Sequence, residues 1–431
     1  PVGSQDLIGQ RIKMIRRQRG MSQAQLAHPE LSDSYVSLIE SGKRTPTPAV
    51  LELLAAKLEC SLTYLINGVT AEQMKELELG LRFAQLALEN GEAAEARRRY
   101  AELLQDENLA GLADLRRDAE YGLALASEAC GDLDEAIAIL NRLRENDAEG
   151  MTPERQVAVT LALCRCYRER GDLTAAVRIG EDALWGEGRP TWNDDLIELG
   201  ATLLMAYLIR GDLLRARHFA AELLNAAEAL GTPRSIVAAC WNGALVAQRT
   251  GRGEEALSLI ERALAIQSET GGPRNLVRLR NAYAYLMLHT RPQDTATAHE
   301  LLLRCWQEMN EAATNSADKA RCAIDLAMAE MMLGRPEAAL DYARRARDLA
   351  GEEISGLRGE AHLVLGQAYR LLHREEEASA ELAVATEWLN KAPRGQEAAQ
   401  NWLSTAETLS LMGDHGKSIT AYHRALECAG L

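Results

Sequence analysis

The sequence predicts an all-α protein in which a small domain of five helices precedes an α-solenoid of about nine helix pairs. A Gly-Asp-like turn recurs about every 40 residues between Gly91 and Gly413. Only 4% of the residues are aromatic, and helix start and stop signals are dense in the first 70 residues. Self-similarity at this period is typical of solenoids, whose units bury their apolar faces against one another.

Charge is distributed unevenly along the chain. Residues 1–68 carry a net charge of +2, whereas the remainder carries −17. An acidic array repels phosphate groups, so we expect any nucleic-acid contact to lie in the N-terminal segment. No apolar stretch is long enough to cross a membrane, no signal peptide is visible, and the eight cysteines are scattered. These features favour a reduced, cytoplasmic protein with no membrane contact.

The first two helices are predicted from their ends. One helix runs from about Ile8 to Arg19 and stops at Gly20. Ser22 caps a short second helix, and Gln25 three positions later completes a capping box.

Three further helices follow in the same segment. Ser32 caps a helix over Asp33–Glu40, Thr47-Pro48 provides a cap and a first-turn proline for the next, and Ser61 caps a last short helix. The turn pair Asn67-Gly68 then ends the segment. We therefore expect one domain over residues 1–68 and a repeat array over residues 69–431.

The motifs Met21-Ser22-Gln23-x-x-Leu26-Ala27 and Ser32-x-x-Tyr35-Val36-Ser37-x-Ile39-Glu40-x-Gly42-Lys43-Arg44-x-Pro46 resemble the lambda-repressor-like helix-turn-helix of the XRE type. The resemblance implies binding to double-stranded DNA, with the third helix in the major groove. It makes Gln23 a phosphate contact that also orients the recognition helix. It implies that Lys43 and Arg44 contact the sugar-phosphate backbone of the DNA. The candidate base-reading residues are Asp33, Ser34, Ser37 and Leu38.

Several positions of this segment allow a structural interpretation. Asp33 would favour the helix dipole without touching a base. By the resemblance, Arg11 and Glu40 form an ion pair between helices one and three, while Arg16, Arg17 and Arg19 form a solvated face. The segment between residues 27 and 32 is shorter than usual and lacks glycine, which leaves open the angle between helices two and three.

The array begins near residue 71, after a second capping box. One unit is predicted as helices over Leu213–Leu230 and Arg234–Thr250, and a similar break recurs at Gly271-Gly272-Pro273. The small residue five positions after each turn is Ala96, Ala136, Ala176, Ala216, Ala256, Ala296, Ala339, Ala378 or Ser418. With Gly366 and Tyr369, this pattern resembles tetratricopeptide repeats.

In such repeats the first helix of each pair lines the inner wall. Counting back from each turn gives a cluster of amide, aromatic and arginine side chains, which suits an extended peptide. The arginines suggest a ligand that carries a carboxylate. The alternative interpretation is ordinary polar contact between helices. The candidate ligand-binding residues are Arg165, Arg168, Trp241, Gln248, Arg278, Asn281, Tyr285, Gln367 and Arg370.

The sequence contains no Gly-rich phosphate loop and no His-Glu-x-x-His motif, so we expect no enzymatic activity, cofactor or metal site. A helix-turn-helix joined to a tetratricopeptide-like array resembles the Rgg and PlcR type of peptide-sensing bacterial regulators. That resemblance implies a homodimeric transcriptional regulator whose array binds a signal, with a peptide favoured, as in quorum sensing. The alternative is an adaptor whose array holds a protein partner and whose N-terminal domain serves only localisation or dimerisation.

Overall fold

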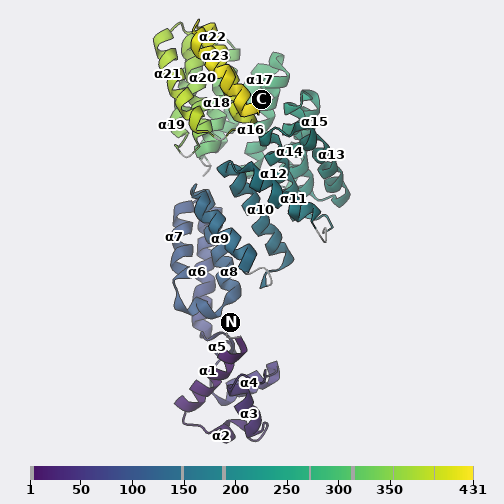
Figure 1. The fold of residues 1–431 in the computed structure, drawn as a ribbon, viewed down its shortest axis with the longest axis vertical. Helices are drawn as coiled ribbons and strands as arrows, with labels where there is room; N and C mark the ends of the chain where they lie inside the picture. The colour runs from purple at the N-terminus through teal and green to yellow at the C-terminus, as the bar shows by residue number, and fades with distance from the viewer. Residues whose placement is uncertain are drawn as a thin grey trace. The chain divides into compact units, whose positions relative to one another are not determined.

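The structure is a computed structural model that describes residues 4–146, 150–186, 191–270, 273–311, 316–352, 354–392 and 394–430. Within these ranges the chain is helical and contains no strand, which confirms the all-α class. The chain forms two compact units, Pro1–Cys130 and Gly131–Leu431. The first unit contains the N-terminal domain and the first three helices of the array (Figure 1).

The N-terminal domain has the five helices that the start and stop signals predict. They are α1 (Ser4–Gln18), α2 (Gln23–Ala27), α3 (Asp33–Glu40), α4 (Pro48–Lys57) and α5 (Leu62–Asn67). Ser22, Ser32, Thr47 and Ser61 each accept a backbone hydrogen bond at a helix start. Ile12, Leu26 and Ile39 are buried in one core with α4 and α5, so the helices pack on each other through their predicted apolar faces.

The short connection between α2 and α3 is held from α4. Lys57 Nζ donates to the carbonyl oxygens of Ala27 at 3.3 Å and His28 at 2.6 Å, and it also pairs with Glu30. The Leu31 amide donates to the Ala27 carbonyl at 2.8 Å. Lys57 thus satisfies carbonyls at the end of α2, the place where a glycine commonly ends a helix.

The array alternates nine first helices and nine second helices in the described part of the chain, in the order that the repeat predicts. The first helices of the pairs are α6 (Ala71–Glu89), α8 (Ala113–Ala129), α10 (Pro153–Arg170), α12 (Asp194–Arg210), α14 (Pro233–Arg249), α16 (Pro273–Thr290), α18 (Ser316–Met332), α20 (Ser355–Leu371) and α22 (Gln396–Leu411). The second helices are α7 (Ala93–Leu104), α9 (Leu133–Asn146), α11 (Leu173–Trp185), α13 (Leu213–Leu230), α15 (Gly253–Thr270), α17 (Thr295–Glu311), α19 (Pro336–Leu349), α21 (Glu375–Lys391) and α23 (His415–Ala429). Two short 3-10 helices, η1 (Glu107–Gly111) and η3 (Pro292–Asp294), interrupt the pattern. The break predicted at Gly271-Gly272 lies outside the described residues.

Eight of the nine predicted turns end the first helix with a left-handed residue. Seven of these residues are glycines, and the eighth is His373, with φ of 58°. The exception is Arg291, where η3 extends the connection. Ala296, the small residue five positions after the sixth turn, is exposed, and Ala298 is buried in its place. The inserted 3-10 turn moves the start of α17, so the fourth residue of that helix becomes Ala298.

The second unit closes on itself. Helix α22 contacts α12, and a Cβ atom on Gly395 would lie 2.7 Å from the carbonyl oxygen of Ile209. Arg249 at the end of α14 also donates a hydrogen bond to Gln400 of α22, which is 151 residues away in sequence. The helices of this unit therefore form a closed array. The rotation between successive pairs accumulates until α22 meets α12.

None of the helices in the described ranges is both long enough and apolar enough to span a membrane.

Candidate functional site

The candidate base-reading residues share one exposed face of α3. Asp33, Ser34, Ser37 and Leu38 are all exposed, and Leu38 is 38% exposed although it is apolar. Val36 and Ile39 of the same helix are buried, so they fix which face points outward. Asp33 also lies 3.4 Å from the His28 ring, and Ser34 bonds to Ser32. Helix α3 thus presents short polar groups and one aliphatic group, a set that suits contacts with phosphate, base edges and a thymine methyl.

The two residues expected to contact the DNA backbone follow α3 directly in the sequence. Lys43 and Arg44 are exposed, and the Arg44 guanidinium lies 5.0 Å from the centre of the Tyr35 ring. Because Tyr35 belongs to α3, this contact orients the arginine beside the exposed face of that helix.

Behind this face lies a buried polar network that joins α1, α2 and α3. Arg16 Nε and Nη2 donate to Glu40 Oε1 and Oε2 at 2.6 and 2.9 Å. Gln23 Nε2 donates to Glu40 Oε2 at 2.8 Å, and Arg16 Nη1 donates to the Met21 carbonyl at 2.7 Å. Gln23 therefore contacts the last residue of α3, as expected of a residue that orients this helix.

The expected ion pair between Arg11 and Glu40 is wrong, because Arg16 occupies the partner position. Arg16 is 8% exposed, so it is also no part of a solvated face. Arg11 instead donates from Nη1 to the carbonyl oxygens of Leu65 at 3.1 Å and Ile66 at 2.6 Å, which ties α1 to α5. Arg16 lies further along the same helix, and only the packing of α3 on α1 decides which arginine meets Glu40.

Hydrogen bonding keeps Glu40 charged. Burial alone would raise the pKa of its carboxyl, but hydrogen bonds from Arg16 and Gln23 outweigh burial and leave the pKa below its ordinary value. The carboxylate at the end of α3 therefore acts as a fixed acceptor around which α1 and α2 are oriented.

The candidate ligand-binding residues of α16 lie on the inner side of the second unit. Asn281 Nδ2 donates to Asp325 Oδ2 of α18 at 2.8 Å. Arg278 lies 3.3 Å from Asp318 Oδ2. Tyr285 stacks at 4.3 Å on the His289 ring, and burial raises the pKa of its hydroxyl to about 12. The structure thus brings α16 and α18 together through polar side chains.

The other candidates are placed differently. Gln367 Nε2 donates to Ser404 at 3.0 Å and Thr408 at 3.2 Å, which links α20 to α22. Trp241 packs against the core cluster of α14–α18, and Gln248 is partly buried. The Nε atom of Arg370 is buried and has no hydrogen-bond partner among the described residues.

Arg165 and Arg168 belong to α10, which precedes α16–α22 in the chain. Arg168 lies 3.4 Å from its neighbour Glu169. Both arginines act on the Cys164 thiol, whose pKa burial nevertheless raises to about 11.

Sequence reasoning missed the residues that carry most of the charge on this inner side. We define the inner charge cluster as Arg249, Asn281, Arg321, Asp325, Glu360 and Glu397. Arg321 and Glu397 form an ion pair at 3.7 Å. The spacing rule that selected Asn281 also reaches Arg321 and Glu360, thirteen positions before their turns.

Two carboxyls of the inner charge cluster have strongly raised pKa values. Burial, followed by repulsion from Glu360, raises the pKa of Asp325 to about 8, despite the Asn281 hydrogen bond. Burial, followed by repulsion from Glu397, raises the pKa of Glu360 to about 7. Raised pKa values caused by burial and like charge are common at binding sites, although structural networks also produce them.

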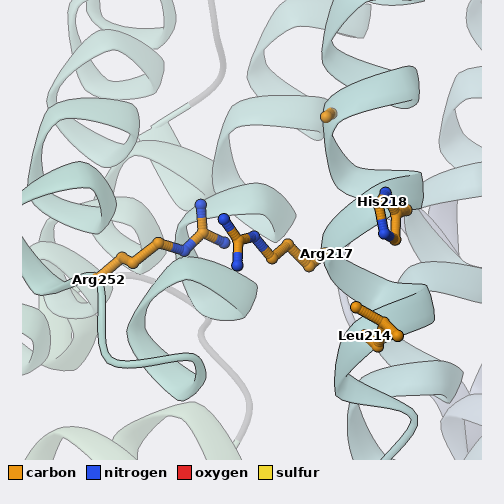
Figure 2. Close-up of a pocket in the computed structure, with 5 residues that line it drawn as sticks. Leu214, Arg217, His218 and Arg252 are labelled. Carbon is orange, nitrogen blue, oxygen red and sulfur yellow. The ribbon is translucent and has the colours of Figure 1, made fainter.

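A separate pocket of about 480 Å³ lies between α13 and α15, lined by Leu214, Arg217, His218, Ala221 and Arg252. Figure 2 shows the guanidinium groups of Arg217 and Arg252 pointing toward each other. Arg252 is already engaged by Glu255, at 2.6 Å, and by Thr250. Leu214 is 71% exposed, so the pocket is an open surface. The inner charge cluster, with buried groups from several helices, is the better candidate ligand site.

The geometry defines a protein with a helix-turn-helix domain of the DNA-binding kind and a tetratricopeptide-like helical array. Residues 12–65 match the helix-turn-helix family. This match confirms the domain that the motifs of residues 7–68 indicate. No curated protein matches the chain.

Among solved structures, the chain is similar to a Rap protein complexed with Competence and Sporulation Factor, with 14% identity, coverage of 82% of this chain and 98% of that one, and a TM-score of 0.54. At this identity the likeness concerns the fold alone. The comparison also found Bacillus thuringiensis PlcR in complex with the peptide PapR7 and DNA, with 17% identity, coverage of 71% and 95%, and a TM-score of 0.35. A tetratricopeptide repeat protein from Parabacteroides merdae has 15% identity, coverage of 69% and 98%, and a TM-score of 0.44.

Proposed function

We propose that the chain is a sequence-specific, DNA-binding transcriptional regulator of the cytoplasm that acts by binding and not by catalysis. The observation that carries this proposal is the exposed face of α3, backed by the buried Arg16–Glu40–Gln23 network. A rigid second layer behind an exposed helix is what base recognition needs, because loosely held side chains lose specificity.

Selection of the full-length protein on randomised duplex DNA tests this proposal. We expect one enriched motif and a steep loss of affinity with added salt, since phosphate contacts dominate such binding. Absence of any enriched motif would contradict the regulator and would favour the adaptor.

The array is proposed to bind a signal on its inner side, with a short peptide as the favoured ligand. Amide and charged side chains from α14 to α22 converge there, and side chains of the cluster remain reachable from solvent. A ligand that spans these helices would stabilise one curvature of the array over others. If the curvatures differ in DNA affinity, binding of the ligand would change that affinity.

The protein is further proposed to form a homodimer through the C-terminal end of the array. Leu411, Ile419 and Leu426 of α22 and α23 are 70, 58 and 48% exposed, and Leu79 and Phe83 of α6, at the start of the array, are 53 and 49% exposed. The exposed apolar side chains of the last helix pair favour burial against a second copy, and a self-complementary two-fold interface closes such an association. Ile419→Glu should convert a dimer into a monomer in sedimentation, whereas Leu214→Glu on α13 should not. A wild-type protein that sediments as a monomer with and without DNA would refute the dimer.

A further inference from the structure

Asp325 and Glu360 are the carboxyls of the inner charge cluster that form no ion pair with any residue in the described ranges. They come from neighbouring inner helices, α18 and α20, and they repel each other. Asp325 is only 7% exposed, and the hydrogen bond that it accepts comes from a neutral amide, Asn281 Nδ2. A buried carboxylate without a counter-charge is costly, so Asp325 keeps its proton near neutral pH unless a cation supplies that charge.

The arginines of the cluster do not supply that cation. Arg321 forms its ion pair with Glu397 at 3.7 Å, and Arg249 donates to the neutral Gln400. Both guanidiniums act on the Glu360 carboxyl at longer range, yet its pKa stays raised. The attraction of the two guanidiniums for the Glu360 carboxylate is therefore weaker than the combined effect of burial and of repulsion from like charge.

A second buried acceptor adjoins Asp325. The amide of Asn281 uses its nitrogen on Asp325, while its Oδ1 atom is buried and accepts no hydrogen bond from the described residues. Buried acceptors of this kind nearly always have a donor. A carboxylate and an unpaired carbonyl oxygen next to each other call for a group that brings several N–H donors and a positive charge.

The inner side is accessible to such a group. The Arg321 and Glu397 side chains, which lie on the inner faces of α18 and α22, are 51 and 46% exposed. Solvent therefore reaches the cluster between these helices, and a ligand side chain can follow the same path.

We propose that Asp325, Glu360 and the Asn281 side-chain oxygen bind a basic group of the ligand, either a protonated primary amine or a guanidinium. Both groups carry a full positive charge and three or more N–H donors, and they would supply the missing counter-charge. This inference rests on the proposed function of the array as a ligand-binding unit. It differs from the carboxylate expected from the sequence, since Arg278 is paired with Asp318.

A metal ion is a poorer match for these carboxyls. The described residues contain no group of three or more histidine, cysteine, aspartate or glutamate side chains arranged to hold one. Two carboxyls and one amide oxygen would leave most of the coordination sphere of magnesium or calcium to water.

The test uses the full-length protein and a positional-scanning library of hexapeptides. In each pool one position is fixed as arginine, lysine, norleucine or glutamate, and the shift of the melting temperature reports binding. The variants are Asp325→Asn and Glu360→Gln, with Glu300→Gln on the exposed side of α17 as the matched control. Because the first two changes remove like-charge repulsion, we expect both variants to melt no lower than the wild type.

We expect arginine or lysine at one position to stabilise the wild type and Glu300→Gln, whereas norleucine and glutamate at that position do not. For the best peptide, Asp325→Asn should weaken binding by about 10-fold or more, as loss of a charge-assisted hydrogen bond does. Peptides that bind without a basic preference, or a preference that survives both substitutions, would overturn this inference and leave the proposed function standing. Stabilisation by magnesium or calcium alone that Asp325→Asn abolishes would also overturn it. If no pool stabilises the wild type, the proposed peptide function fails and the inference fails with it.

Discussion

Arg16 and Glu40 meet through two parallel hydrogen bonds of 2.6 and 2.9 Å, with side chains that are 10 and 2% exposed. This buried pair holds the end of α3 on α1, and Gln23 adds α2 to it. The position of the exposed face of α3 therefore depends on residues that are themselves hidden from DNA.

Removal of one partner of this pair should loosen the N-terminal domain. Arg16→Ala leaves the Glu40 carboxylate buried and without its cation, which typically costs about 3–5 kcal/mol. We expect amide hydrogen exchange in α1–α3 of the full chain to become roughly 150- to 5,000-fold faster. Arg17→Ala, at the exposed neighbouring position, is the control and should change exchange little. Equal protection in both variants would mean that the pair contributes no net stability.

Arg44 should contribute to DNA affinity without reading sequence. Arg44→Ala removes one phosphate contact, so it should weaken binding to all sequences and lower the salt slope by about 1. Leu38→Ala should instead change the preference at one position of each half-site. Lys75→Ala, an exposed lysine of α6 outside the N-terminal domain, is the matched control. Fluorescence anisotropy over a salt series measures these effects, and an Arg44→Ala slope equal to that of the wild type would refute the assignment.

The raised pKa values of Asp325 and Glu360 predict a loss of stability as the pH rises. Both carboxyls have pKa values near 4 when the chain is unfolded, and about 8 and 7 when it is folded. The folded chain therefore holds more protons between about pH 4 and 8, and the free energy of unfolding falls across that window. The slope is at most about 1.4 kcal/mol per pH unit for each carboxyl.

The double variant Asp325→Asn, Glu360→Gln tests this effect, because it removes both of the carboxyls whose pKa values are raised. We expect its melting temperature to match that of the wild type near pH 4.5 and to exceed it increasingly up to about pH 8. A difference that stays constant over this range would show that neither carboxyl titrates there.

Asn281 and Trp241, both expected on the inner wall, should behave differently when mutated. Asn281→Ala removes the donor to Asp325 and should abolish the response of DNA binding to the ligand while leaving basal DNA binding intact. Trp241→Ala removes an indole that packs on the α14–α18 core, so it should also lower stability, by about 2–3 kcal/mol for this partly buried site. Thermal unfolding and DNA binding with and without the stabilising peptide separate the two effects. If DNA binding by Asn281→Ala still responds normally to the ligand, the ligand site does not include Asn281.

Closure of the second unit should depend on the lack of a side chain at Gly395. The Cβ atom of Gly395→Ala would lie 2.7 Å from the Ile209 carbonyl oxygen, so α22 must move away from α12. Spin labels on exposed positions of α12 and α22 should report a longer and broader distance distribution. Gly416→Ala on α23 has nothing within 4 Å of its added carbon and is the control. If the distances between the labels on α12 and α22 are unchanged in Gly395→Ala, the added carbon is accommodated by a local shift near Ile209 without opening the array.

Much of the fold follows from local sequence. Helix starts are set within a few residues by side chains such as Ser22 and Thr47, and the turns by residues that adopt positive φ. The prediction of α3 and of Leu213–Leu230 is therefore correct to the residue. Where a local event lacks a simple residue signature, as with η3 before α17, the register of Ala296 is predicted wrongly.

Tertiary packing decided the rest. Which arginine of α1 meets Glu40 depends on how α3 lies across α1, and Arg11 and Arg16 look alike in sequence. The inner charge cluster draws its residues from α14 to α22, and its Arg249 bonds to Gln400, 151 positions away, because small rotations between helix pairs accumulate until α22 meets α12. Sequence could place Asn281 and Arg321 on the inner wall by their spacing from a turn. Only the closed array buries Asp325 and brings Glu360 near it, since burial and like-charge repulsion depend on every neighbouring helix.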